Sequence, residues 1–529
     1  SWLLMLFTAI SLGVSAQTIT VKGNVKDTTG EPIIGASVVE KGNTTNGTIT
    51  DLDGNYSIKV PSKATLTISY IGMKTQDIAV KGQSQINVTL SDDTQALDEV
   101  VVIGYGTVAK KDLTGSVSSV SAKQIAAIPV SSASEALQGK MAGVSITTTE
   151  GSPDADVKIR VRGGGSLSQD NSPLYIVDGF PVSSISDIAP TDIQSVDVLK
   201  DASSTAIYGS RASNGVVLVT TKKGKAGKVE ISYDFMYGVQ QPTSLPKIAD
   251  SWVYAELYNE AAVNSGRAAK FTPEQIAQFR NGGPNVNWVK ELYHRNSPQS
   301  SHNVSMTGGN DQLSYMASLG YMDQNSMFKG PDYGYKRYNA RLNVSHKVTN
   351  NFTLNLTSQF ARNDIKEHAY WTEWIIEQAN RMPPIYPIKN EDGSYNYPAG
   401  SNSNGLQRLE EGGYRQNVND ELLGTIQAEW EVYKGLKLIG SAGGRVWNNN
   451  LHENRKAFEG TGDSENKLTE QFYRSKNITT NLMVTYNTKI GKHSIGGLLG
   501  YAYEGFSEKQ FSTSRLTEDS KYDIFVGDL

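Results

Sequence analysis

The ten residues "NFTLNLTSQF", 351–360, alternate between apolar and polar side chains along most of their length. In an extended segment, alternate residues point to opposite faces. The apolar face carries Phe352, Leu354, Leu356 and Phe360, and the polar face carries Thr353, Asn355, Thr357 and Gln359. This pattern is typical of a strand in an antiparallel sheet that is buried on one side.

The same alternation recurs from about residue 228 onward. In "RYNARLNVSHK" (337–347), Arg341 falls on the polar face together with Asn339 and Asn343, and "TIQAEWEVY" (425–433) alternates in the same way. We therefore expect strands near 229–240, 299–308, 312–323, 335–347, 351–363, 421–433, 435–448, 477–490 and 492–505.

The connections between these strands are alternately long and short, with "GGND", "VTNN", "YKG" and "IGK" in the short ones. Tight turns at one end and long loops at the other are typical of an outer-membrane β-barrel. Apart from the N-terminus the chain has no long apolar run, so we expect it to enter a membrane only as a barrel. Because nine or so strands precede Leu529, we expect this barrel to be partial.

Three further units precede these strands. Residues 1–16, "SWLLMLFTAISLGVSA", resemble a signal peptide that is clipped at its start. Residues 17–92 contain short alternating segments separated by Gly, Asp and Pro, which predicts a small β-sandwich. Residues 108–225 mix strands, such as "VKIRVRG" and "GVVLVTTKKG", with a short helix capped at Ser132 or Ser134, which predicts an α+β unit.

The linker 93–107 contains "DEVVVIGYGT" (98–107), where two acids precede four β-forming residues and glycines flank a tyrosine. Two interpretations stay open from the residues alone. The segment is either an ordinary strand of a neighbouring domain, or an exposed segment that adds to the sheet edge of a partner protein.

Composition excludes several function classes. The net charge of −4 gives no reason to expect a nucleic-acid partner, and the absence of cysteine excludes thiolate metal sites and cysteine nucleophiles. The six histidines lack ligand spacing, and no nucleophile–base set stands out, so we expect no metal, no cofactor and no enzyme activity.

Three stretches resemble SusC/RagA-type TonB-dependent outer-membrane transporters: "LDEVVVIGYGTVAKKDLTGSVSSV" (97–120), "VKIRVRGGGSLSQDNSPLYIVDGFPV" (157–182) and "DIQSVDVLKDASSTAIYGSRASNGVVLVTTKKG" (192–224). The resemblance implies a mainly β protein. Its parts would be a carboxypeptidase-regulatory-like sandwich at 17–92, a linker with a TonB-box-like segment at 93–107, a plug at 108–225, and at 226–529 the first part of a 22-stranded transmembrane barrel.

The resemblance also implies a function. In this family a plug blocks the barrel until TonB, energised by ExbB–ExbD, pulls a segment near the plug's N-terminus. A SusD-like surface lipoprotein commonly caps the barrel, and the substrates are oligosaccharides or sometimes peptides. The N-terminal domain would then lie in the periplasm and the barrel in the outer-membrane bilayer. The alternatives are a non-transporting adhesin or assembly barrel and a secreted β-rich binding protein.

Three groups of candidate site residues follow. With the resemblance, the TonB-contact interpretation is favoured for Asp98, Glu99, Val100, Val101, Val102, Ile103, Gly104 and Tyr105. Ion pairs that hold the plug in the barrel are expected among Arg160, Arg162, Arg211, Asp178, Asp197 and Asp201. Stacking on sugar rings is a candidate role for Tyr370, Trp371 and Trp374, with loop packing, lid contact or a membrane-interface girdle as the alternatives.

Overall fold

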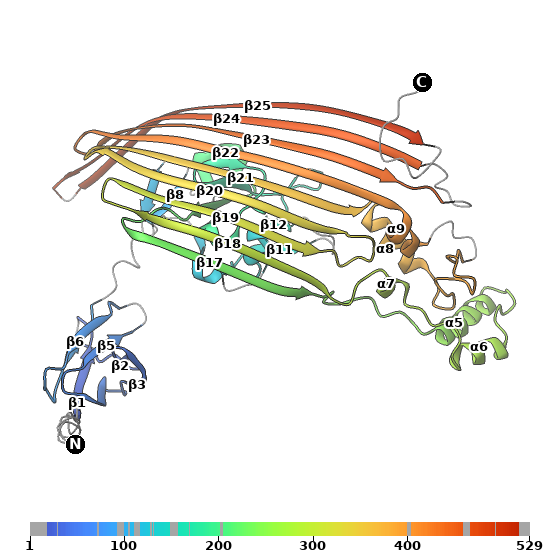
Figure 1. Cartoon of the computed structure of the whole chain (residues 1–529), viewed down its shortest axis with the longest axis horizontal. Coiled ribbons are helices and arrows are strands. Elements are labelled where there is room, and N and C mark those ends of the chain that lie inside the picture. The colour runs from blue at the N-terminus through green and yellow to red at the C-terminus, as the bar shows by residue number, and fades with distance from the viewer. Residues whose placement is uncertain are drawn as a thin grey trace, which may run out of the picture. The chain divides into compact units, whose positions relative to one another are not determined.

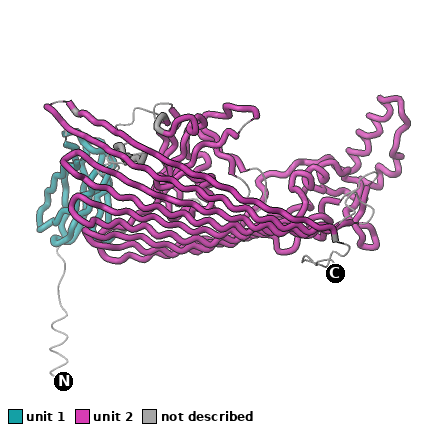
Figure 2. The backbone as a smooth tube through the Cα atoms, turned by 90° about the horizontal axis from the view of Figure 1, so that it is seen from above, with its two compact units in different colours: residues 1–101, 107–113 teal, residues 102–106, 114–529 magenta. Residues whose placement is uncertain are grey.

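A computed structural model describes residues 18–28, 30–70, 73–91, 100–103, 106–109, 117–126, 130, 132–148, 157–168, 170–201, 205–398, 404–458, 466–491 and 493–517. The chain divides into two compact units, distinguished by colour in Figure 2. The first comprises residues 1–101 with 107–113, and the second comprises residues 102–106 with 114–529.

Two sheets form the first unit, with strand orders β4-β1-β7 and β3-β2-β5-β6. Their strands pair antiparallel, except that β1 and β7 run parallel. The strands are β1 (Thr18–Lys26), β2 (Ser37–Glu40), β3 (Asn43–Ile49), β4 (Asn55–Pro61), β5 (Thr65–Ser69), β6 (Gln76–Ala79) and β7 (Val88–Thr89). Val21 and Ile58 from one sheet join Val38 and Leu66 from the other in a single buried cluster. Alternation along β4 buries every second side chain, as expected for one face of a sandwich.

Tyr56 belongs to this core and gives a testable pH dependence. Its side chain is 5% exposed, its hydroxyl donates to the Ile86 carbonyl at 2.8 Å, and burial raises its pKa to about 12. An unfolded tyrosine has a pKa of about 10, so above that pH the unfolded state loses its proton first. Stability present below pH 10 should therefore fall by about 1.4 kcal/mol per pH unit as pH rises toward 12.

Urea unfolding of residues 17–92 followed by circular dichroism measures this fall. The Tyr56→Phe variant should start less stable but lose that pH slope. An unchanged slope in the variant would show that another group causes it.

The region that the resemblance predicts to be a plug, called the plug below, forms a five-stranded sheet of order β10-β15-β16-β13-β14 and a two-stranded sheet β11-β12. Its elements are β10 (Val117–Ser121), α2 (Ala122–Ala126), α3 (Ala133–Ala136), β11 (Val144–Thr148), β12 (Val157–Val161), β13 (Leu174–Val177), β14 (Phe180–Val182), η3 (Pro190–Asp192), β15 (Ile193–Leu199), η4 (Ala206–Ala212) and β16 (Val216–Thr221). The helix predicted near Ser134 is α3, and Ser132 is its N-cap. Strand β14 was not predicted; a two-residue Asp178-Gly179 turn with positive φ at both residues produces it.

Nine consecutive antiparallel strands form the large sheet, in chain order from β17 to β25 (Figure 1). They are β17 (Gly227–Gln240), β18 (Ser297–Gly309), β19 (Leu313–Asn325), β20 (Gly334–Thr349), β21 (Phe352–His368), β22 (Gly413–Tyr433), β23 (Leu436–Arg455), β24 (Asn466–Ile490) and β25 (His493–Thr517). All nine predicted strands are confirmed. The last four strands extend well beyond the predicted ranges. Their pairing continues toward the long loops through polar residues, beyond the part where apolar and polar side chains alternate.

Helices gather at the long-loop end of this sheet, opposite the tight turns (Figure 1). The loop between β17 and β18 carries α5 (Ser251–Asn264), α6 (Pro273–Arg280) and α7 (Trp288–Glu291). The loop between β21 and β22 carries α8 (Thr372–Arg381) and α9 (Gly405–Glu411). Across the part of the chain that the structure describes, none of the helices combines the length and apolar character needed to cross a bilayer.

Candidate functional site at the plug–barrel interface

Arg341 on β20 is the central contact between the nine-stranded sheet and the plug. Its side chain is only 2% exposed. Its guanidinium lies 3.4 Å from the Asp178 carboxylate, at the β13–β14 turn, and 3.7 Å from the Asp192 carboxylate in η3. A buried charge in this position is tolerated only when it is paired, so these two plug acids hold a barrel arginine that water does not reach.

Further hydrogen bonds hold Asp178 and Asp192 in position beside Arg341. Asp178 accepts from the Thr221 backbone N–H at 2.9 Å and from the Thr221 hydroxyl at 2.6 Å, which ties the turn to the end of β16. Asp192 accepts from the Ser318 hydroxyl of β19 at 2.8 Å. Asn343, next to Arg341 on the polar face of β20, donates to Thr221 and to the Lys222 carbonyl at 3.0 and 2.7 Å.

Burial dominates the electrostatics of Asp192. Desolvation raises the pKa of this carboxyl, while the nearby Arg341 and the Ser318 hydrogen bond act in the opposite direction. The charge of Asp192 is therefore held in place by its partners rather than by solvent. Separating the plug from the nine-stranded sheet would part both Asp178 and Asp192 from Arg341.

A second set of contacts lies along the plug segment that follows β14. Arg445 on β23 pairs with Glu421 on β22 at 2.5 Å and donates to the Ser183 hydroxyl of the plug at 3.0 Å. Asn363 on β21 donates to the Asp187 carboxylate at 2.6 Å. Together with the Arg341 contacts, these bonds attach the plug to strands β19, β20, β21 and β23.

Close packing supports the polar contacts at one point. The Phe180 ring, which is buried at the start of β14, lies against Gly443 of β23. A Cβ atom at position 443 would come within 2.7 Å of the ring, so only glycine fits there without displacing the plug.

The six predicted ion-pair residues have three different environments. Asp178 pairs with Arg341, and Arg211 pairs with Glu504 of β25, so both join plug to barrel. Arg162 pairs with Asp201 inside the plug, and Asp197 accepts hydrogen bonds from Ser119 on the neighbouring strand β10 and from Ser195 on its own strand β15. Arg160 makes no ion pair within 4.0 Å among the described residues. Sequence adjacency to the plug strands did not reveal which side chains point outward from the plug.

The sequence analysis did not identify four residues of this interface. They are Arg341 and Arg445 of the barrel and Asp187 and Asp192 of the plug. A signal for Arg341 was present, since it lies on the polar face of a predicted barrel strand, which is the face that lines the barrel interior where a plug would lie. The register that brings it to Asp178, 163 residues away, was not available from the sequence.

Four of the predicted TonB-contact residues are described. Val100–Ile103 form β8, which pairs with β9 (Gly106–Ala109) in a separate two-stranded sheet. Among the described residues β8 has no other strand neighbour, so it is not part of the plug sheet. Asp98, Glu99, Gly104 and Tyr105 lie outside the described residues.

The three candidate glycan-contact residues have different environments. Tyr370 is 8% exposed and Trp374 is partly buried, and both face the buried Arg408 of α9, whose guanidinium carbon lies 5.0 and 4.5 Å from their ring centres. These two rings therefore pack the loop core around a cation. Trp371 is 76% exposed and is the one of the three whose ring remains available to a ligand.

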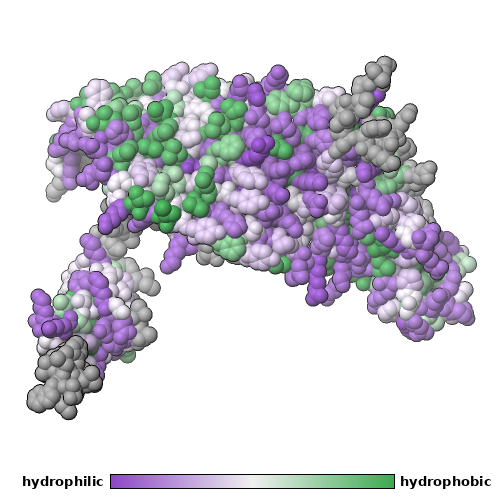
Figure 3. Space-filling model, in the orientation of Figure 1, coloured by the Kyte–Doolittle hydropathy of each residue, from purple (hydrophilic) through white to green (hydrophobic). Residues whose placement is uncertain are grey.

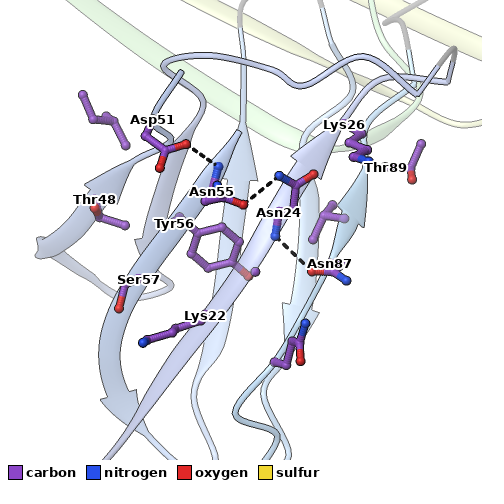
Figure 4. A pocket seen from close by; sticks show the side chains of 14 residues that line it. Lys22, Asn24, Lys26, Thr48, Asp51, Asn55, Tyr56, Ser57, Asn87 and Thr89 are labelled. Carbon is purple, nitrogen blue, oxygen red and sulfur yellow. Dashed lines mark hydrogen bonds between the residues drawn. The ribbon is translucent and has the colours of Figure 1, made fainter. Parts of the chain in front are cut away.

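The first unit carries a polar hollow of about 790 Å³ across β4, β1 and β7. Asn24 lies at its centre: its backbone N–H donates to Asn87 at 3.0 Å and its side chain donates to Asn55 at 2.9 Å (Figure 4). Lys22, Lys26 and Asp51 also line it. We assign no ligand to this hollow.

In the described part of the chain no three His, Asp or Glu side chains gather as a metal site would require.

Two family models match this chain. The TonB-dependent receptor plug domain matches residues 109–216, and a carboxypeptidase-regulatory-like domain matches residues 21–102. The plug match, together with the nine-stranded antiparallel sheet against which this domain packs, places the chain in the class of TonB-dependent receptors.

Similar proteins narrow the class. The TonB-dependent receptor SusC of Bacteroides thetaiotaomicron is 36% identical over 442 residues, which cover 81% of this chain and 41% of SusC. TonB-dependent receptor P3 of Formosa agariphila is 33% identical to this chain, and the alignment covers 95% of this chain and 50% of P3. The solved RagAB peptide importer in its open-open state is 26% identical with a TM-score of 0.66, covering 79% of this chain and 50% of that chain.

The chain belongs to the SusC/RagA type of TonB-dependent receptors. It spans half or less of the length of these curated relatives. The relatives are receptors rather than enzymes, and proteins of this class are outer-membrane β-barrels.

Proposed function

We propose that this receptor imports oligosaccharides or other large nutrients across the outer membrane, with the plug as its gate and TonB as its energy source. The observation that carries the proposal is the buried contact of Arg341 with Asp178 and Asp192, which joins the plug to the barrel wall through groups that can separate without breaking covalent bonds. A domain held in this way blocks a pore at rest and is released by a pull.

We further propose that β8 is the segment that TonB grips. Binding by strand addition requires an extended segment with an unpaired edge. Val100–Ile103 are extended, and β9 is their one strand neighbour in the described chain, which leaves the other edge for a partner. In this proposal ExbB–ExbD supply the energy and the N-terminal domain lies in the periplasm.

The substrate class and the lid are parts of the same proposal. A SusD-like surface lipoprotein would cap the long-loop end, as the RagAB likeness suggests. Peptide import is the alternative, because the similar solved structure is described as a peptide importer. An adhesin or assembly barrel is less well supported, since it has no need of a gate.

Trp371 provides a test of the sugar hypothesis. If its exposed ring stacks on a sugar, Trp371→Ala should weaken oligosaccharide binding by about 1–2 kcal/mol, or roughly tenfold, while Trp371→Phe retains most of the affinity. Isothermal titration with the purified receptor measures this. Equal affinity for the parent and for Trp371→Ala would remove Trp371 from the site.

Uptake of labelled compounds tests the substrate class. Cells deleted for this receptor and complemented from its own locus would be given fluorescent oligosaccharides and fluorescent peptides of matched size. We expect receptor-dependent accumulation of oligosaccharides. Accumulation of peptides alone would establish the alternative, and accumulation of neither would contradict import.

A further inference from the structure

The strand register identifies the face of the sheet that points away from the plug. Arg445 and Glu504 contact the plug, so the residues directly before and after them on β23 and β25 face outward, and every second residue from there shares that face. On β24 and β25 this outward face carries the large apolar side chains Ile478, Leu482 and Leu499, all more than half exposed. Figure 3 shows hydrophobic side chains gathered over the part of the sheet near the tight turns, as expected of a lipid-facing band.

Three cations follow directly where this apolar band ends, on the side of the long loops. Lys476 is two residues beyond Ile478 on the outward face of β24, and Arg474 is two residues further. Arg474 lies directly opposite Lys509 of β25 in the register. Like charges directly opposite each other on adjacent strands destabilise a sheet unless an anion neutralises them.

The nearby outward-facing acids are already paired with other groups. Asp420 lies 3.4 Å from Arg362, and Glu470 lies 2.6 Å from His452. Glu504 and Glu508 of β25 point to the opposite face, where they contact Arg211 and Tyr473. Within the described part of the chain, no carboxylate lies within 4.0 Å of Arg474, Lys476 or Lys509.

Neighbouring side chains hold Arg474 in place. Its Nε donates to the Asn448 side chain at 2.6 Å, and its guanidinium lies 5.2 Å from the Phe472 ring centre. Phe472 in turn stacks on Phe511 at 5.3 Å between ring centres. With Nε occupied by Asn448, the terminal nitrogens of Arg474 remain as donors suited to a phosphate.

We propose that Arg474, Lys476 and Lys509 bind the phosphate of a lipid headgroup in the leaflet at the long-loop end. The acyl chains of that lipid lie along the apolar band over Ile478 and Leu499, which puts its phosphate at the level of the cations. The outer leaflet of an outer membrane contains phosphorylated lipid A, which has this chemistry. The proposal rests on the outer-membrane class and not on the substrate.

The intact, detergent-purified receptor tests the proposal by native mass spectrometry with added phosphorylated lipid A. The triple variant Arg474→Gln, Lys476→Gln, Lys509→Gln should lose apparent affinity on the order of 100-fold, and Lys509→Gln alone on the order of fivefold. A matched control removes three cations near the tight turns, Lys434→Gln, Lys437→Gln and Lys489→Gln, and should bind like the parent. Lipid A without its phosphate should bind the parent and the triple variant equally weakly.

Three results would overturn the proposal. The first is equal retention of phosphorylated lipid A by the parent and by a triple variant whose circular dichroism matches the parent. The second is an equal loss in the control variant. The third is complete displacement of the lipid by inorganic phosphate at a similar concentration, which would show a site for free phosphate.

Discussion

Replacing Val101 with proline should abolish import while the receptor stays folded and inserted. Val101 is the second residue of β8, and proline removes the backbone N–H that a strand needs to pair with a partner sheet. Because β8 lies outside the five-stranded plug sheet, the change leaves the sheet order of the plug and barrel intact. Uptake of labelled substrate, with surface labelling to confirm insertion, measures the effect.

The matched control for this prediction is Val101→Ala, which keeps the N–H and should import within about threefold of the parent, since the β propensity scale spans only ~1 kcal/mol. Normal import by the proline variant would mean that TonB grips another part of the chain. The β8–β9 pair would then be a structural hairpin.

Replacing Arg341 with leucine should loosen the plug by about 3–5 kcal/mol, because Asp178 and Asp192 would stay buried without the cation that pairs with them. Hydrogen exchange of the amides in β16 and η3, measured by mass spectrometry on the intact receptor, reports the free energy of local opening. The exchange of these segments should accelerate strongly in the variant.

Arg362→Leu is the control, because Arg362 forms its pair with Asp420 on the outward face with half of its side chain exposed. Exposed pairs contribute about 0–1 kcal/mol, so its plug exchange should match the parent. Adding Asp178→Asn and Asp192→Asn to Arg341→Leu should recover part of the loss. If Arg341→Leu and Arg362→Leu behaved alike, the buried contact would not hold the plug.

The nine strands were predictable because their signals are local. Alternation such as that of 352–360 and short turns such as the one between β24 and β25 depend only on neighbouring residues. The long-loop ends of β22 to β25 were not predicted. Outside the apolar band, the residues of a paired strand and those of a polar loop have similar composition.

The site was less predictable because it depends on long-range register. Asp178 was identified as a plug anchor, but its partner lies on a strand 163 residues later. Composition also could not separate the roles of neighbouring aromatics: Tyr370 and Trp374 pack on Arg408, which enters from α9, while Trp371 between them in sequence is exposed.

Import and surface binding measured together, with and without TonB, test the central claim most directly. Cells that express the receptor from its own locus in a TonB-deficient background should bind labelled substrate at the surface as the parent strain does, while accumulation inside falls to the level of a receptor deletion. Accumulation that stays unchanged without TonB would contradict a plug that a TonB pull must release.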